Sequence, residues 1–221
     1  KILFDMGPDD GFLENAKKMN LDLSQVDIAF LSHIPNMTLM SPKNIRELNE
    51  MLRFAVRYNG PVAVRYPKCP APAVFPDHME PISLGKWEVL KEGEDFALIF
   101  EGSMSETANT VYEKLLERGK NPFLINARFM KPLDTEGLEA LKNRSIRVFT
   151  IEDGVRAGGM GASIREALGD LGAPELFIHN FGFPDTFIEQ GAIPELFKKY
   201  GLDADAVAGR IISILDKTDD K

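Results

Sequence analysis

The sequence predicts a three-layer α/β protein, in which a mostly parallel sheet carries helices on both faces. Short runs rich in β-branched and aromatic residues alternate along the chain with longer segments whose apolar residues recur at helical spacing. The clearest unit is an apolar run over 146–151 that ends in Glu152-Asp153-Gly154, followed by a glycine-containing loop and a segment with inward positions at Ile164 and Leu168. Such strand, loop and helix units build parallel sheets.

The same reading assigns the other elements in order. Expected strands cover 2–5, 26–31, 37–40, 62–66, 96–100, 122–127 and 176–179, and expected helices cover 12–19, 42–58, 108–118, 135–141, 193–200 and 204–215. Ser41 is the expected N-cap of the helix at 42–58, with Pro42 at its first position, and Asp134 is the expected cap of the helix that follows it. Prolines at 70, 72, 76 and 81 mark 69–82 as a linker between a unit at 1–68 and a domain at 83–221.

The composition narrows the class of partner. With 34 acidic and 26 basic residues the chain carries a net charge of −8, which argues against a nucleic acid or an anionic membrane surface as partner. The single cysteine, Cys69, excludes an internal disulfide and favours a cytoplasmic location. Apolar runs are shorter than the ~20 residues that a membrane-spanning helix needs.

The loop after Glu152-Asp153 admits two interpretations. Glycines at 158, 159 and 161 could let backbone N–H groups bind a phosphate at a helix N-terminus. Their spacing matches neither the dinucleotide fingerprint nor the Walker loop, and two carboxylates stand where they would repel the phosphate. We therefore expect a close strand-to-helix turn, with the carboxylates in turn and helix-cap roles rather than catalytic ones.

Residues 1–33 resemble the start of a metallo-β-lactamase-fold hydrolase, with an opening Ile-Leu-Phe-Asp-Met-Gly and an Asp-Ile-Ala-Phe-Leu-Ser-His string at 27–33. That family continues into a His-x-His-x-Asp-His motif that binds metal, whereas this chain continues from His33 into Ile-Pro-Asn-Met. His78 and His179 are isolated in the sequence. No metal site is therefore expected, and a metallohydrolase is rejected.

From about residue 26 to 221 the chain resembles the C-terminal portion of the 1-deoxy-D-xylulose-5-phosphate synthase family. The resemblance rests on Met-Ser-Pro-Lys-Asn (40–44), Gly-Pro-Val-Ala-Val-Arg-Tyr-Pro-Lys (60–68), Asn-Ala-Arg-Phe-Met-Lys-Pro-Leu-Asp (126–134), Ile-Glu-Asp-Gly-Val-Arg-Ala-Gly-Gly-Met-Gly (151–161) and Gly-Phe-Pro-Asp-Thr-Phe-Ile-Glu-Gln-Gly (182–191). It implies the end of a thiamine-diphosphate-binding (pyrimidine) domain followed by a transketolase C-terminal domain. It also implies the family reaction, in which pyruvate and glyceraldehyde 3-phosphate give 1-deoxy-D-xylulose 5-phosphate and CO2 for isoprenoid synthesis.

The resemblance implies an incomplete enzyme. The family holds thiamine diphosphate and Mg²⁺ with a Gly-Asp-Gly and Asn clamp, and activates the cofactor with a glutamate; neither motif is found in these 221 residues. No catalytic, cofactor-binding or metal-binding residue is therefore assigned, and no cofactor is expected for this chain alone. Lys68, at the position of a family basic residue, is the one candidate substrate contact, for the aldehyde's phosphate.

Two functions stay open on this reading. The first is a fragment of a transferase that is inactive alone. The second is a non-catalytic interaction module, which would form a homodimer or pair with another transketolase-type chain through an exposed sheet edge.

Overall fold

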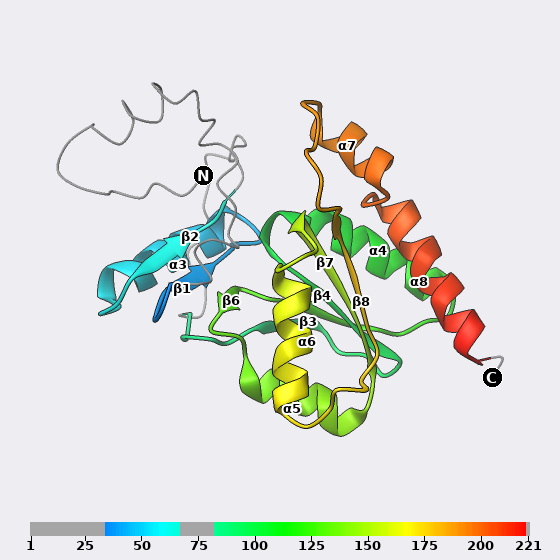
Figure 1. Cartoon of the computed structure of the whole chain (residues 1–221), viewed down its shortest axis with the longest axis horizontal. Coiled ribbons are helices and arrows are strands. Elements are labelled where there is room, and N and C mark those ends of the chain that lie inside the picture. The colour runs from blue at the N-terminus through cyan, green and yellow to red at the C-terminus, as the bar shows by residue number, and fades with distance from the viewer. Residues whose placement is uncertain (1–33, 67–81, 220–221) are drawn as a thin grey trace.

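The computed structural model describes residues 34–66 and 82–219 (Figure 1). The elements expected at 2–5, 12–19 and 26–31, the linker at 69–82 except its last residue, and Lys68 lie outside the described residues. Within the two described stretches, no helix is both long and apolar enough to cross a membrane.

The larger sheet has five strands in the order β3-β5-β4-β7-β8. Its strands are β3 (Glu88–Lys91), β4 (Phe96–Phe100), β5 (Phe123–Asn126), β7 (Arg147–Val155) and β8 (Ile178–Phe183). β4, β5, β7 and β8 are parallel to their neighbours, and β3 joins β5 in antiparallel orientation. This confirms the predicted α/β class, with one antiparallel edge strand added.

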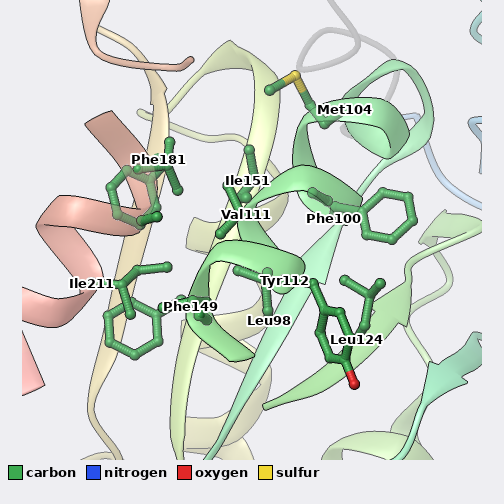
Figure 2. Packing of buried hydrophobic residues seen from close by; sticks show 14 of the residues in the cluster. Leu98, Phe100, Met104, Val111, Tyr112, Leu124, Phe149, Ile151, Phe181 and Ile211 are labelled. Atoms are coloured by element: carbon green, nitrogen blue, oxygen red, sulfur yellow. The ribbon is translucent and has the colours of Figure 1, made fainter. Parts of the chain in front are cut away.

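The two faces of this sheet follow from period-two alternation in the strands. Along β4, Phe96, Leu98 and Phe100 point to one face, and Ala97 and Ile99 to the other. The first face packs against α4 (Ser105–Glu117) and α8 (Ala204–Asp219). Figure 2 shows this core, in which Leu98, Phe149 and Phe181 from three strands lie beside Val111 of α4 and Ile211 of α8. The aromatic side chains fill much of this layer.

The opposite face is covered by α5 (Thr135–Arg144) and α6 (Met160–Asp170). Leu138 and Leu141 of α5 and Ile164 and Leu168 of α6 are buried against it. Helices therefore cover both faces of the larger sheet, as predicted. α5 is capped by Asp134, whose side chain accepts a hydrogen bond from the Gly137 backbone, so that expectation is confirmed.

A second, three-stranded sheet has the order β2-β1-β6. β1 (Thr38–Met40) and β2 (Val62–Val64) are parallel and linked by α3 (Ile45–Arg57), which confirms the expected crossover. β6 (Phe129–Lys131) was not predicted as a strand. It follows β5 closely in the chain yet pairs with β1 in antiparallel orientation, and it thereby joins the two sheets through the backbone.

The predicted cap of α3 is wrong. Asn44 caps the helix by accepting a hydrogen bond from the Glu47 backbone, and the helix starts at Ile45. Ser41 lies instead against Gly102, where its backbone N–H donates to the Arg128 carbonyl. Tertiary packing therefore removes Ser41 from the cap, and Asn44, an equally good capping residue, replaces it.

Two further helical segments complete the described chain. A short 3-10 turn, η2 (Gly102–Met104), leads from β4 into α4, and α7 (Ile193–Tyr200) precedes α8. α7 has no buried residue, and Gly201 ends it in a left-handed conformation.

Candidate functional site

The larger sheet has a topological switch point between β4 and β7. β4 is followed by α4 on one face and then by its neighbour β5, whereas the chain returns through α5 on the other face to β7, on the opposite side of β4. Open α/β sheets bind ligands in the crevice outside the carboxyl ends of such strands. Glu101 follows β4 directly, and Asp153 lies near the end of β7, so both carboxylates meet at this crevice.

Arg65, from the segment just after β2, fills the crevice. Its guanidinium lies 2.6 Å from Glu101 Oε1 and also forms an ion pair with Asp153. The hydroxyl of Ser103 donates to the Asp153 carboxylate. We call Arg65, Glu101, Ser103 and Asp153 the switch-point cluster. The position at which a sheet of this kind usually holds a ligand is therefore occupied by a side chain from the smaller sheet.

The charges in this cluster are unequal, because two carboxylates share one arginine. Burial raises the pKa of Glu101 to about 8; Arg65 opposes the rise, and the charge of Asp153 adds to it. For Asp153 burial also acts to raise the pKa, but Arg65 and hydrogen bonds from Glu101 and Ser103 prevail and lower it. The pKa of Arg65 is raised by the two carboxylates against the effect of burial. A neutral Glu101 beside an ionised Asp153 follows.

The gap between the cluster and the smaller sheet is narrow. Gly102 has φ +40°, and a Cβ added there would lie 1.8 Å from Ser41 Oγ. A side chain at this position would displace Ser41. Glycine is required both by its backbone conformation and by the close approach.

The N-terminus of α6 is occupied by Glu152. Its carboxylate accepts hydrogen bonds from the backbone N–H groups of Met160, at 2.8 Å, and Gly161, at 3.2 Å. Burial raises the pKa of Glu152 to about 7, while these two hydrogen bonds act to lower it. A Cβ on Gly159 would lie 2.1 Å from Glu152 Oε2. The carboxylate thus takes the position of a phosphate, which decides for the close turn over a phosphate loop.

A second group of charges, buried or partly buried, lies where α3 meets β3 and β5. Glu47 is fully buried, and its carboxylate accepts hydrogen bonds from Arg128 Nε at 2.5 Å and from Asn126 Nδ2 at 2.9 Å. Glu88 pairs with Lys43 and, at 2.9 Å, with Arg128. We call these five residues the α3 cluster. It too joins the smaller sheet's helix to the larger sheet.

The predicted site residues have different outcomes. Lys68 lies outside the described residues, so its phosphate contact stays a prediction. Glu152 has the expected helix-cap role, whereas Asp153 pairs with Arg65, which the sequence did not indicate. Glu101 directly follows the strand expected at 96–100, and that position was the available signal, whereas Arg65 was expected inside the strand at 62–66 and directly follows β2 in the structure. Over 34–66 and 82–219, no three His, Cys, Asp or Glu side chains are grouped so as to hold a metal ion.

Comparison with known protein families agrees with this arrangement. The sequence model of the family described as "Transketolase, C-terminal domain" matches residues 85–207, and that of "Transketolase, pyrimidine binding domain" matches residues 22–72. Among solved structures, one described as "Split gene transketolase, inactive beta4 tetramer" is similar with a TM-score of 0.69 and 26% identity, covering 84% of this chain and 60% of that chain.

Curated relatives give the same family. The 1-deoxy-D-xylulose-5-phosphate synthase of Clostridium acetobutylicum is 42% identical over 190 residues, covering 85% of this chain, and that of Caldanaerobacter subterraneus subsp. tengcongensis is 43% identical over 195 residues, covering 84%. The chain spans 30% of the length of each of these relatives. The C-terminal family alone accounts for more than half of the 221 residues. The chain therefore belongs to the transketolase family.

Proposed function

We propose that this chain is the C-terminal part of a thiamine-diphosphate-dependent transferase of the 1-deoxy-D-xylulose-5-phosphate synthase type, and that it has no activity alone. The observation that carries the proposal is the occupied switch point. Arg65 forms ion pairs with Glu101 and Asp153 where a ligand would bind, so the larger sheet serves there as a docking surface for the pyrimidine unit. The family relatives support the reaction: pyruvate and glyceraldehyde 3-phosphate to 1-deoxy-D-xylulose 5-phosphate and CO2.

The domain division is part of the proposal. Residues 1–68 form a partial pyrimidine unit, 69–82 link it to the rest, and 83–221 form the C-terminal domain. The two family matches, which end at 72 and begin at 85, support this division. β6 belongs to the C-terminal domain in sequence and completes the sheet of the pyrimidine unit, so we expect the two units to unfold together.

We expect the missing cofactor clamp to be supplied by a partner. The partner is a second transketolase-type chain that carries the clamp and the activating glutamate, or the chain forms a homodimer. The similar solved structure is itself described as a split-gene product and an inactive β4 tetramer, which supports association without activity.

The test is a calorimetric titration of the chain with thiamine diphosphate and Mg²⁺, alone and after mixing with the N-terminal portion of a relative's synthase. We expect no binding alone, and binding with synthase activity after mixing. Cofactor binding by the chain alone would contradict the proposal. If mixing gives a stable complex without cofactor binding, the second candidate function, a non-catalytic association module, is favoured instead.

The reconstituted complex also tests Lys68. Replacing Lys68 with Ala is expected to raise KM for glyceraldehyde 3-phosphate about tenfold, since removing one charge-assisted contact costs roughly 1.4 kcal/mol or more. Lys120→Ala, which removes a lysine near the end of α4, is the control and should leave KM unchanged. An equal KM for the two variants would remove Lys68 from the substrate site.

A further inference from the structure

A second concave site lies beside β8, the edge strand of the larger sheet. It is an open depression of about 410 Å³ between the end of β7, helix α6 and the loop after β8. Its polar lining consists of Arg156, Arg165, His179, Asn180 and Asp185, and we call it the β8-edge depression. The volume lies in the range of roughly 300–1,000 Å³ that small-molecule sites have.

The donors in this depression are uncompensated. Within the described residues, the Arg156 side chain makes no hydrogen bond or ion pair. Arg165 donates to the Ile178 carbonyl at 2.6 Å, which holds its guanidinium against β8 without neutralising it. Neither arginine lies within 4.0 Å of a described carboxylate, Asp185 included. In a chain of net charge −8, two arginines that line one depression without a carboxylate partner indicate a local site for an anion.

The floor of the depression is rigid. Thr150 is fully buried, and its hydroxyl donates to Asn180 Oδ1 at 3.1 Å, so the Asn180 amide N–H groups remain as donors. Gly161 lies against this pair, because a Cβ there would be 2.4 Å from Asn180 Cγ and 2.5 Å from Thr150 Oγ1. The amide is therefore fixed by packing rather than free to rotate.

The pKa of His179 responds to the electrostatic potential of the nearby arginines. Partial burial lowers its pKa, and Arg210 of α8 together with Arg156 and Arg165 lowers it further. Asp185 is the one acidic side chain in the described lining. The arginines lower the pKa of His179 even though Asp185 belongs to the same lining.

We propose that the β8-edge depression binds the phosphate group of a small phosphorylated molecule. Arg156 and Arg165 supply the charge and the forked hydrogen bonds that suit phosphate, and Asn180 supplies a further donor. The site is independent of the proposed reaction, because none of its residues belongs to the switch-point cluster and Lys68 is not part of it.

NMR titration of the full 221-residue chain with inorganic phosphate tests this. The three histidines give few ring signals, and His179→Gln assigns the relevant one. We expect saturating phosphate to raise the pKa of His179 and to shift its signal with a hyperbolic concentration dependence, while acetate at equal ionic strength does not. An equal shift with acetate would mean charge screening alone and would overturn the proposal.

Variants with opposite expected effects on phosphate binding make the test specific. Arg156→Ala should weaken phosphate binding at least tenfold, whereas Asp185→Asn should tighten it a few-fold by removing a repelling charge. Arg165→Gln keeps a donor for the Ile178 carbonyl and should also weaken binding. Arg118→Ala, an exposed arginine at the end of α4, is the charge-matched control and should bind as the wild type does.

Two further outcomes complete the test. Glycerol 3-phosphate should bind at least as tightly as inorganic phosphate, because the depression is open and has room for the ester. If Arg156→Ala retains wild-type binding while its thermal transition is unchanged, the proposal is wrong.

Discussion

The two buried charge clusters differ in balance, although both join the smaller sheet to the larger one. In the α3 cluster two carboxylates, Glu47 and Glu88, meet two cations, Lys43 and Arg128. In the switch-point cluster two carboxylates meet only Arg65. In the unbalanced cluster burial raises the pKa of Glu101 to about 8, so this joint between the two sheets depends on pH.

The largest expected effect comes from breaking the balanced cluster. Glu47→Ala removes the fully buried one of the two carboxylates that Arg128 and Asn126 contact and leaves only Glu88 as their acceptor. Removal of one partner from a buried ion pair costs about 3–5 kcal/mol. Urea unfolding should show this loss in the free energy of unfolding. Glu50→Ala on the same helix removes only a pair with the exposed Arg53 and should cost about 0–1 kcal/mol. Equal losses for the two variants would refute the distinction.

The unbalanced cluster predicts a pH-dependent stability. The folded pKa of Glu101, about 8, lies above its ordinary value of 4.5, so the unfolded chain releases this proton first as the pH rises. The stability that the proton contributes is complete below pH 4.5 and is lost as the pH approaches 8. Glu101→Gln removes this ionisation. Between pH 5 and 8 the variant should lose on the order of 2 kcal/mol less than the wild type.

Chemical denaturation at several pH values measures that difference. Burial raises the pKa of Glu152 to about 7, so the Glu101→Gln variant still shows part of the dependence of the free energy of unfolding on pH. Glu92→Gln, an exposed carboxylate in the turn after β3, is the matched control and should retain the full slope. If the free energy of unfolding depends on pH as steeply in Glu101→Gln as in this control, a group other than Glu101 causes the dependence.

The smallest effect concerns the close approach between the two units. Gly119→Ala meets no neighbouring atom and should cost roughly 1 kcal/mol for its positive φ alone. Gly102→Ala carries the same kind of backbone strain and also collides with Ser41, so it should cost about 1–2 kcal/mol more. Thermal unfolding of the two variants measures the extra cost. Equal unfolding temperatures for Gly102→Ala and Gly119→Ala would mean that Ser41 moves aside without a cost in stability.

Much of the fold could be predicted from local patterns. The continuous apolar run at 96–100 and the helical spacing of Leu138 and Leu141 are set by which side chains avoid water, so they identified β4 and α5 without tertiary information. The Asp134 cap was predicted for the same reason, because its hydrogen bond to the Gly137 backbone joins residues three apart. The glycines after Glu152 do not have the spacing of a phosphate loop, and this likewise predicted a close turn there.

What the sequence could not determine depends on long-range pairing. β6 is three residues long and has no alternation to detect; its strand character comes from pairing with β1, about 90 residues earlier. Arg65 was expected inside a strand and Asp153 in a turn or helix cap, and only the strand order brings them together with Glu101 at the switch point. Ser41 lost its predicted cap role to packing against Gly102. The sequence by itself thus determined most of the elements in the described part of the chain, and the family, through local hydrophobic patterning and family motifs. The tertiary structure alone decided which charges share a buried space, because that depends on strand order rather than on neighbours in the chain.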